Sequence, residues 1–364
     1  MPAKIVILGM GDTGVLTAVR LRGCGNVTIV APKGGMVSGQ ELGLRLAQPR
    51  TWLSTSIFQA SRYRALRNTR IVHGRANRVD PTTREVHVME TDGTVRVIGY
   101  DVLLIATGTT SGFWRTGELE TLEATERRVV EHAARLRDAR TIAVVGAGPS
   151  GVSVAYNLKR RNPHQGVHLI QRGPTILPGY ARPVQASLSS QLGELGVRLH
   201  LGRPAIPPPS PPEGPVPGPL HLSSGASALP ADVIVWTTGG MRPNTDFLPD
   251  EWLDESGFVR VSETLEVPGT HGVFAVGDVA ATDPNRSSAR NAGHAIAAAN
   301  IRAVTRGRTP ARRFRAPPGH RWGSIVGLQP DGMSVYLLTG RRLHFGAWLA
   351  VSYTHLTLPT TPYV

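Results

Sequence analysis

Two glycine-rich turns are the segments of this sequence whose residue types and spacing could do chemistry. Their glycines follow the spacing G-x-G-x-x-G: Gly9, Gly11 and Gly14 in the first turn, and Gly146, Gly148 and Gly151 in the second. A bound dinucleotide needs the backbone amides of a helix N-terminus beside its pyrophosphate, with no side chain in the way. The first glycine makes the turn, the second lets the phosphate approach, and the third lets helix and strand pack closely.

Each turn lies between an expected strand and an expected helix, which is the context that this motif requires. Apolar runs predict strands over residues 4–8 and 27–30 around a helix that reaches about Arg22, and over residues 141–145 and 167–170 around a helix that reaches about Arg161. One such match is weak, because glycine-rich turns are common, but two in the same context are much stronger. The sequence therefore predicts two βαβ units, each binding a dinucleotide.

Two crossings and an acidic motif join these units into one enzyme. Ala106, Thr107 and Gly108 follow a buried strand and resemble the point at which FAD-binding domains pass the chain to an inserted nucleotide-binding domain. The run from Thr238 to Gly240, with Gly239 at its centre, resembles the return crossing. Near the end of the first domain, Gly277 and Asp278 resemble the distal FAD motif, whose carboxylate accepts hydrogen bonds from ribityl hydroxyls.

A helix expected over residues 288–302 follows the acidic motif. Its N-terminus, at Asn291 and Ala292, should face the pyrimidine end of the flavin. The helix dipole would then stabilise negative charge on the reduced flavin.

The chain is similar to the pyridine-nucleotide oxidoreductase superfamily over about residues 3–350. Within it, the likeness is to apoptosis-inducing-factor-like, ferroptosis-suppressor-type and type II NADH dehydrogenase enzymes. It is carried by residues 37–43, the run to Gly108, and residues 314–332. The resemblance implies an α/β fold with two nested, Rossmann-like, three-layer domains and a short, truncated C-terminal α+β region. It also implies FAD as cofactor and NADPH or NADH as co-substrate.

The expected domain organisation follows from the nesting. Residues 1–110 and 239–310 should form a discontinuous FAD-binding domain, and residues 111–238 an inserted NAD(P)H-binding domain. Residues 311–350 should form the partial C-terminal domain. The tail 351–364 has no helical periodicity and resembles a translated sequencing adapter, so we expect it to be artefactual; a genuine β-prone tail is the alternative.

The sequence departs from the family pattern at three positions. The second strand of the first unit should end in an acid for the adenosine ribose, but Lys33 stands there, after Ala31 and Pro32. In the second unit, Gln171 and Arg172 replace the acid that would favour NADH, so NADPH should be used at least as well. Many relatives carry a glutamate inside the second helix, where this chain has Ser153.

The NAD(P)H-binding set therefore comprises the second glycine turn with Ser150, together with Gln171, Arg172 and Gly239. The FAD-binding set comprises the first glycine turn with Lys33, the first crossing, the acidic motif and the helix start after it. No protein catalytic residue is assigned, because the flavin carries the chemistry.

Cys24 is the one cysteine, so neither a disulfide nor a CxxC redox pair can form within one chain, and a cysteine-type zinc site is excluded. Electrons must then leave directly from the flavin. We expect an NAD(P)H:acceptor oxidoreductase that reduces a quinone-like or other small acceptor. A ferredoxin-type carrier reductase and a flavin-bearing redox-sensing protein with little turnover are the alternatives.

Charge and composition bear on partners and location. The apolar fraction of 40% fits a globular enzyme, and no apolar run reaches the length of a membrane span. The net charge of +14 comes almost wholly from dispersed arginines, so specific nucleic-acid binding is not expected. We expect a cytoplasmic protein; peripheral contact with anionic lipid at the inner face of the membrane and a homodimer stay open.

Overall fold

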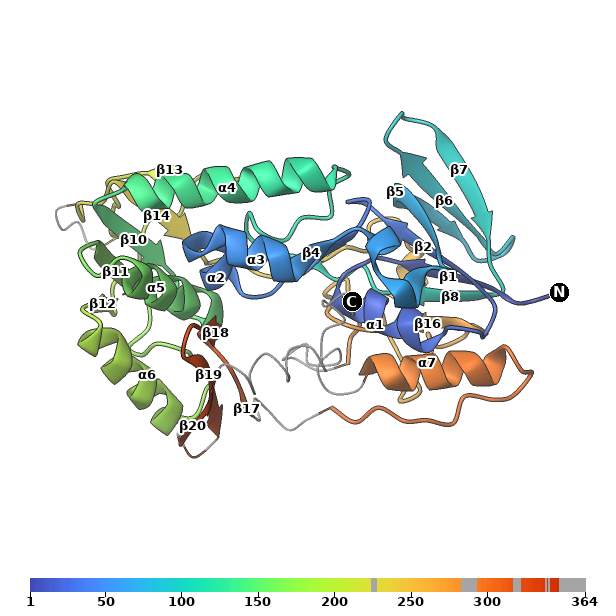
Figure 1. The fold of residues 1–364 in the computed structure, drawn as a ribbon. Helices are drawn as coiled ribbons and strands as arrows, with labels where there is room; N and C mark the ends of the chain where they lie inside the picture. Colours follow the sequence, from blue (N-terminus) through green and yellow to red (C-terminus); the bar gives the residue numbers. More distant parts are fainter. Residues whose placement is uncertain (224–227, 283–292, 317–321, 338, 340, 347–364) are drawn as a thin grey trace.

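The structure is a computed structural model that describes residues 1–223, 228–282, 293–316, 322–337, 339 and 341–346. It contains two large, mostly parallel sheets that lie at opposite ends of the molecule, with helices between and around them (Figure 1). The expected α/β class is confirmed. Predictions for Asn291, Ala292 and the tail 351–364 fall outside the described residues.

The first sheet has seven strands in the order β16-β8-β1-β2-β5-β6-β7. These are β1 (Lys4–Leu8), β2 (Asn26–Ala31), β5 (Arg70–Asp80), β6 (Glu85–Glu90), β7 (Val95–Gly99), β8 (Val102–Ile105) and β16 (Val273–Ala275). β16, β8, β1, β2 and β5 pair in parallel, whereas β5, β6 and β7 pair antiparallel. The predicted strand 4–8 is therefore confirmed. The alternating residues 85–89 and 94–98 predict a small antiparallel meander, which β6 and β7 confirm.

Alternate residues of the parallel strands enter two different cores, as the period of two requires. Ile5 and Ile7 pack with helices α1 (Asp12–Arg20) and α7 (Gly293–Val304). Val6 and Leu8 pack on the opposite face with residues of the antiparallel strands. Helices, parallel sheet and antiparallel meander form the three expected layers.

The second sheet has five strands in the order β12-β11-β10-β14-β13. These are β10 (Thr141–Val145), β11 (Gly166–Gln171), β12 (Arg198–Leu201), β13 (Val216–Pro217) and β14 (Val233–Trp236). Helices α4 (Leu122–Asp138), α5 (Pro149–Arg161) and α6 (Arg182–Glu194) supply apolar residues to the core on one face. Both predicted βαβ units are thus present.

The prolines between Arg203 and Leu220 exclude a helix or a central strand and predict a surface loop, but the stretch is more than that. It forms the edge strand β13, where a proline is tolerated because one side of the strand needs no ladder bond. Leu220 and Leu222 from this stretch are buried against Ile170 and Trp236 of the sheet. It therefore covers the face of the second sheet that lacks helices.

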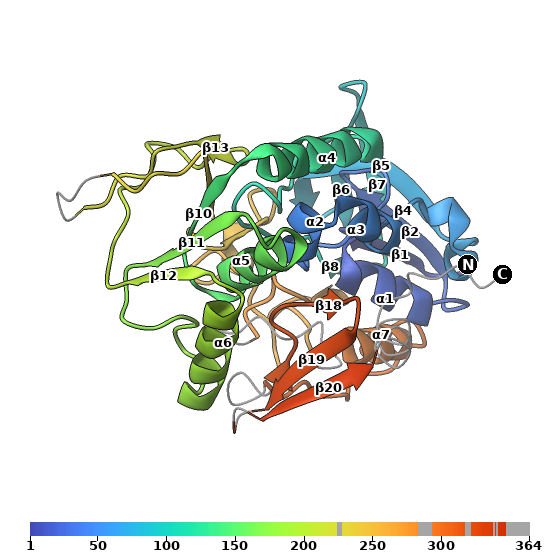
Figure 2. The ribbon, with the colours of Figure 1, turned by 60° about the vertical axis from the view of Figure 1, so that its left-hand side comes forward.

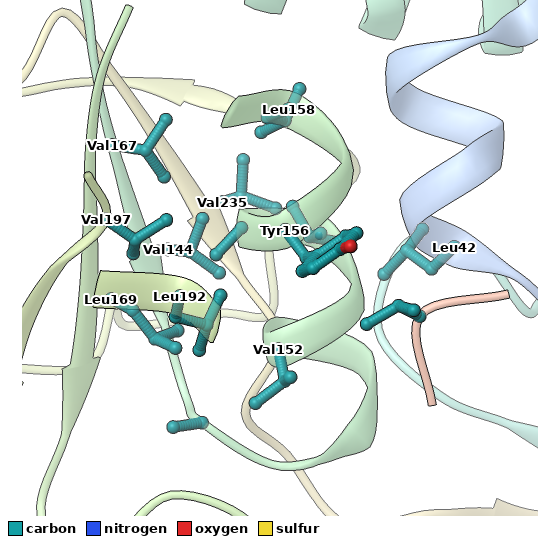
Figure 3. Packing of buried hydrophobic residues seen from close by; sticks show 14 of the residues in the cluster. Leu42, Val144, Val152, Tyr156, Leu158, Val167, Leu169, Leu192, Val197 and Val235 are labelled. Atoms are coloured by element: carbon teal, nitrogen blue, oxygen red, sulfur yellow. The ribbon is translucent and has the colours of Figure 1, made fainter. Parts of the chain in front are cut away.

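A helical segment between β2 and β5 joins the two halves. It contains β3 (Met36–Val37), α2 (Leu42–Ala47), α3 (Pro49–Ser56), β4 (Ile57–Phe58) and short 3₁₀ turns at Ala60–Arg62 and Arg64–Leu66. Leu42 of α2 points toward Tyr156 of α5 within the shared core (Figure 3). A Cβ on Gly43 would lie 2.3 Å from Ser153 O, so α2 and α5 pack with their backbones close together.

The C-terminal residues form a small antiparallel sheet against the second half, seen beside α5 and α6 (Figure 2). Its strands are β17 (Trp322–Gly323), β18 (Leu328–Gln329), β19 (Gly332–Leu337) and β20 (Arg342–Gly346). The buried Asn157 amide of α5 donates to Val326 O at 2.9 Å, and Tyr336 OH donates to Gln191 Oε1 of α6 at 3.0 Å. The apolar run 334–338 predicts a strand, which β19 confirms in its described part, and the next apolar segment, 343–349, begins within β20.

His132 of α4 is a buried titratable group in this fold. Its ring is 4% exposed and packs edge-on against Phe113, with 5.1 Å between ring centroids. Burial, reinforced by the positive charges of Arg45, Arg135 and Arg128, lowers the pKa of His132 to about 4. The native state therefore holds His132 neutral where an unfolded chain would protonate it.

We expect His132 to make the free energy of unfolding fall with acidity between pH 6.5 and about 4. Because its pKa is lower when folded, its neutral form is favourable above pH 6.5, and this contribution is lost as pH falls. At pH 5 the loss should be about 1–2 kcal/mol. His132→Leu should flatten the difference in urea stability between pH 7.5 and pH 5, whereas the same change at the exposed His164 should not. An unchanged pH slope in His132→Leu would contradict the assignment.

Candidate functional site

The predicted FAD-binding positions gather at one edge of the first sheet. β16, β8, β1 and β2 are parallel neighbours, so their carboxyl ends meet at that edge. Gly9, Lys33, Ala106 and Gly277 each follow one of these strands within one or two residues. Ligands of open α/β sheets bind outside such carboxyl ends.

The three glycines of the first turn lie in three different surroundings. Gly9 has φ +103° and a Cβ there would lie 2.4 Å from Ala106 O, and a Cβ on Gly14 would lie 2.2 Å from Gly9 O. By contrast, Gly11 has φ −78° and a Cβ on it would meet nothing within 4 Å. Gly11 is also the N-cap of α1, with no side chain capping the helix. The turn thus offers open space beside helix amides and fits a pyrophosphate.

Asp12 puts a carboxylate in the first turn of α1, next to the space for an anion. Its Oδ2 accepts hydrogen bonds from Ser38 Oγ at 3.2 Å and from Gln40 Nε2 at 3.4 Å. These donors come from the segment that leads into α2. The carboxylate of Asp12 is therefore held in place by hydrogen bonds from neutral side chains.

The second turn repeats this geometry at the edge of the second sheet. Gly146 has φ +102°, and a Cβ on Gly151 would lie 1.7 Å from Gly146 O. A Cβ on Gly148 would meet nothing within 4 Å, and Gly148 caps α5 without a side-chain hydrogen bond. Proline at the first position of α5 suits a helix start. Ser150 lies half-buried in the same first helical turn.

Thr237 supports the second turn and was not predicted from the sequence. Its Oγ1 lies 2.9 Å from both Val145 O and Gly146 O, so the hydroxyl can satisfy the turn carbonyls. Gly239, two residues further along the chain, has φ +125°, and a Cβ there would meet nothing within 4 Å. A threonine beside a crossing carries no signal strong enough to assign this role in advance.

Gln171 ends β11 at the position predicted to meet the nucleotide ribose. Its Oε1 accepts a hydrogen bond from Ala147 N, inside the glycine turn, at 3.3 Å. Arg172 follows and is exposed, and Arg203 N donates to Gln171 O at 3.0 Å. The structure thus brings Gln171 to the second turn and leaves a guanidinium accessible beside it.

The two crossings between the sheets lie side by side. β9 (Thr109–Thr110) pairs antiparallel with β15 (Arg242–Pro243). Thr107 Oγ1 donates to Asn244 O at 2.8 Å, and Asn244 Nδ2 donates to Thr107 O at 3.0 Å. Gly108 accepts from Asn244 N through its carbonyl, 3.1 Å away. Asn244 therefore fastens the outgoing crossing to the returning one.

Asp278 lies at the edge formed by the carboxyl ends of the parallel strands of the first sheet, called here the first edge. It forms an ion pair that was not predicted from the sequence. Arg115 Nη1 is 2.8 Å from Asp278 Oδ2, with both side chains about one-fifth exposed (23% and 19%). A Cβ on Gly277 would lie 3.0 Å from Thr13 Oγ1 of α1, so Asp278 is also close to the first glycine turn. Arg115 is 163 residues away in sequence, and no local pattern predicts such a contact.

Lys33 also has a carboxylate partner from the segment between the sheets. Its ammonium pairs with Glu120 and donates to Thr116 Oγ1 at 3.2 Å. Burial lowers the pKa of Lys33, although Glu120 opposes the shift. The positive charge of Lys33, at the position where the family resemblance predicts an acid, is therefore balanced by the carboxylate of Glu120.

Two further features concern metals and membranes. Within the described residues, no three His, Cys, Asp or Glu side chains lie close enough together to bind a metal ion. None of the helices in the described part of the chain combines the length and apolar character needed to cross a membrane.

Two curated relatives cover much of the chain. Oxidoreductase ptaL of Pestalotiopsis fici is 32% identical over 291 residues, which are 76% of this chain and 76% of ptaL. The type II NADH:quinone oxidoreductase Ndh of Mycobacterium tuberculosis is 27% identical over 69% of this chain and 61% of its own length.

Solved structures share the fold at lower identity. A ferredoxin reductase from Rhodopseudomonas palustris has a TM-score of 0.69 at 18% identity, covering 92% of this chain and 88% of its own. NDH2 from Plasmodium falciparum has a TM-score of 0.67 at 13% identity, covering 98% and 95%. The family model for pyridine nucleotide-disulphide oxidoreductases matches residues 2–299. With two glycine turns open to dinucleotides and this match over most of its length, the chain belongs to the pyridine nucleotide-disulphide oxidoreductase family and is a flavoprotein oxidoreductase that binds FAD and NAD(P)H.

Proposed function

We propose that this chain is an NAD(P)H:acceptor oxidoreductase whose acceptor is a quinone or a similar small molecule. The observation that carries this proposal is the pair of open glycine turns, one per sheet, in a chain with one cysteine. A single cysteine cannot form the redox disulfide through which some flavoenzymes relay electrons. The likeness to a type II NADH:quinone oxidoreductase also supports a quinone acceptor.

The first edge holds FAD in this proposal. The turn Gly9–Gly14 receives the pyrophosphate, Ala106 to Gly108 borders it, and Gly277 brings Asp278 toward the ribityl hydroxyls. Arg115, paired with Asp278 at 2.8 Å, is an additional cation at this edge. The predicted boundaries, with residues 1–110 and 239–310 around an inserted 111–238, remain our proposal for the two domains.

The second edge holds the nicotinamide nucleotide. Gly146, Gly148 and Gly151 receive its pyrophosphate at the start of α5, with Ser150 in the first helical turn. Gln171 and Arg172 meet the adenosine ribose, and Gly239 leaves room beside the returning crossing. When bound, FAD would supply the redox chemistry between NAD(P)H and the acceptor. The protein positions both nucleotides and provides the charged groups around them.

A carrier-protein reductase is the second candidate. The net charge of +14 would attract an acidic carrier, and the fold is shared with a ferredoxin reductase. This charge is spread over the chain, however, and the same fold serves several acceptors. We rank the small acceptor first.

Steady-state oxidation of NADH and NADPH should distinguish these acceptors. We expect a short-chain ubiquinone or a naphthoquinone to be reduced with a kcat/KM at least about tenfold above that of a plant-type ferredoxin. A preference for ferredoxin would favour the carrier reductase. Stoichiometric flavin reduction without turnover on any acceptor would favour a redox-sensing protein.

Substitutions of the middle glycines should separate the two nucleotide sites. Valine at Gly11 or Gly148 meets no protein atom near its Cβ and keeps a permitted φ, so both variants should fold. Gly11→Val should weaken FAD binding at least about tenfold. Gly148→Val should keep FAD and weaken NAD(P)H binding by a similar factor. Gly14→Ala, the control for close packing, should instead lower the melting temperature. Equal loss of both nucleotides in both variants would contradict the assignment.

Arg172 should select for NADPH. Its exposed guanidinium lies beside the ribose position, where Gln171 offers no carboxylate to repel a 2′-phosphate. We expect Arg172→Ala to lower the NADPH/NADH ratio of kcat/KM about five- to tenfold, a cost typical of one exposed phosphate contact. Arg161→Ala, at another exposed arginine, is the control. An unchanged ratio in Arg172→Ala would show that another group makes the selection.

A further inference from the structure

Glu120 lies beside the end of β2, after which the family resemblance predicts an acid that this chain lacks. The residues after β2, Pro32 and Lys33, carry no carboxylate. Glu120 comes from the segment between β9 and α4, and its backbone N donates to Pro32 O at 2.9 Å. His73 Nε2, from β5, donates to the Glu120 carbonyl at 2.9 Å. These two contacts to its backbone hold Glu120 beside the carboxyl end of β2 and beside His73 of β5, which pairs with Ala31.

The Glu120 side chain is held in place by two cations. Lys33 pairs with Oε1 and Arg128 of α4 pairs with Oε2. The Glu120 and Lys33 side chains are 13% and 14% exposed, so both are close to the surface but not free in solvent. A carboxylate has about four acceptor sites, and two cations leave capacity on each oxygen.

The end of β2, which Glu120 contacts, is joined to the first glycine turn. Gly9 N, in that turn, donates to Val30 O of β2 at 2.9 Å, so the turn and the end of β2 are directly joined. In dinucleotide-binding units, the pyrophosphate at the turn and the ribose at the end of the second strand belong to one ligand. The ribose hydroxyls need an acceptor there, and Lys33 has none to offer.

We propose that Glu120, from the segment between the two sheets, is the acceptor for the adenosine ribose hydroxyls of FAD. Lys33 and Arg128 are positioning residues that hold its carboxylate at the end of β2. Lys33, at the position where the family resemblance predicts an acid, would then hold the carboxylate of Glu120, which comes from a distant part of the chain. This inference rests on FAD binding at the first turn. Its alternative is a purely structural ion pair that ties the connecting segment to β2.

The test compares equilibrium binding of FAD with binding of its 2′-deoxy- and 3′-deoxyadenosine analogues, followed by quenching of flavin fluorescence. The wild-type chain should bind FAD about tenfold more tightly than at least one analogue, as expected for a hydroxyl bonded to a carboxylate. In Glu120→Gln, FAD binding should weaken by about that factor while analogue binding stays within about twofold, so the preference disappears. Glu118→Gln, at an exposed acid near Lys33, should keep the preference.

Other results would overturn the assignment. A structural ion pair predicts that Glu120→Gln weakens FAD and its analogues equally, together with a lower melting temperature. Glu120→Asp keeps a negative charge beside Lys33 and Arg128, so it replaces Glu120→Gln in the test if that variant does not fold. Because its carboxylate is withdrawn by one methylene, it should still lose most of the preference for FAD over the deoxy analogues. Equal binding of FAD and both analogues by the wild-type chain would contradict the proposed role of Glu120, but it would leave FAD binding at the first glycine turn intact. A chain that binds no flavin contradicts the FAD site as well.

Discussion

The close approach of helix and strand at the third glycine of each turn is the contact on which the rest of this structure depends. At Gly14 and Gly151 a Cβ would lie 2.2 and 1.7 Å from the carbonyl oxygen of the first glycine in the same turn. These backbone oxygens cannot move aside without breaking the turn. The close approach therefore fixes the distance between each helix and its sheet. The uncapped N-termini of α1 and α5 are consequently left at the strand ends, where they can face an anion. Packing and ligand binding thus share one cause.

The distance between the two nucleotide edges is set by contacts of a different kind. Asn244 joins the two crossings through hydrogen bonds to Thr107 and Gly108, and Gly43 lets α2 lie against the backbone of α5. Ser153 stands on α5 at that contact, and a Cβ on Gly43 would lie 2.5 Å from Ser153 Oγ. A residue larger than glycine at position 43 would therefore collide with α5 and separate the two helices.

The sequence predicted those features that arise from neighbouring residues. Alternating apolar runs and fixed glycine spacings identified β1, α1, β10 and α5 with their turns, because the interactions that form them span a few residues. It failed to identify α2, α3 and α6, whose short or weakly amphipathic segments are stabilised by packing against distant elements. It also missed Thr237, Arg115 and Glu120, since each contacts a partner at least 87 residues away in the sequence, which no local pattern reveals. The proline-rich stretch was read as exposed because proline excludes helix, yet an edge strand accepts it.

Arg115 and Glu120 lie five residues apart on the segment that leaves the first sheet for the second. Through Asp278 and Lys33 they meet two separated points of the first edge, near the ends of β16 and β2. The same segment continues into α4, whose Arg128 completes the second ion pair. A ligand that binds the carboxylate of Asp278 or of Glu120 therefore also contacts the connection between the two halves of the molecule. Its binding free energy therefore includes the cost of any ordering of that connection.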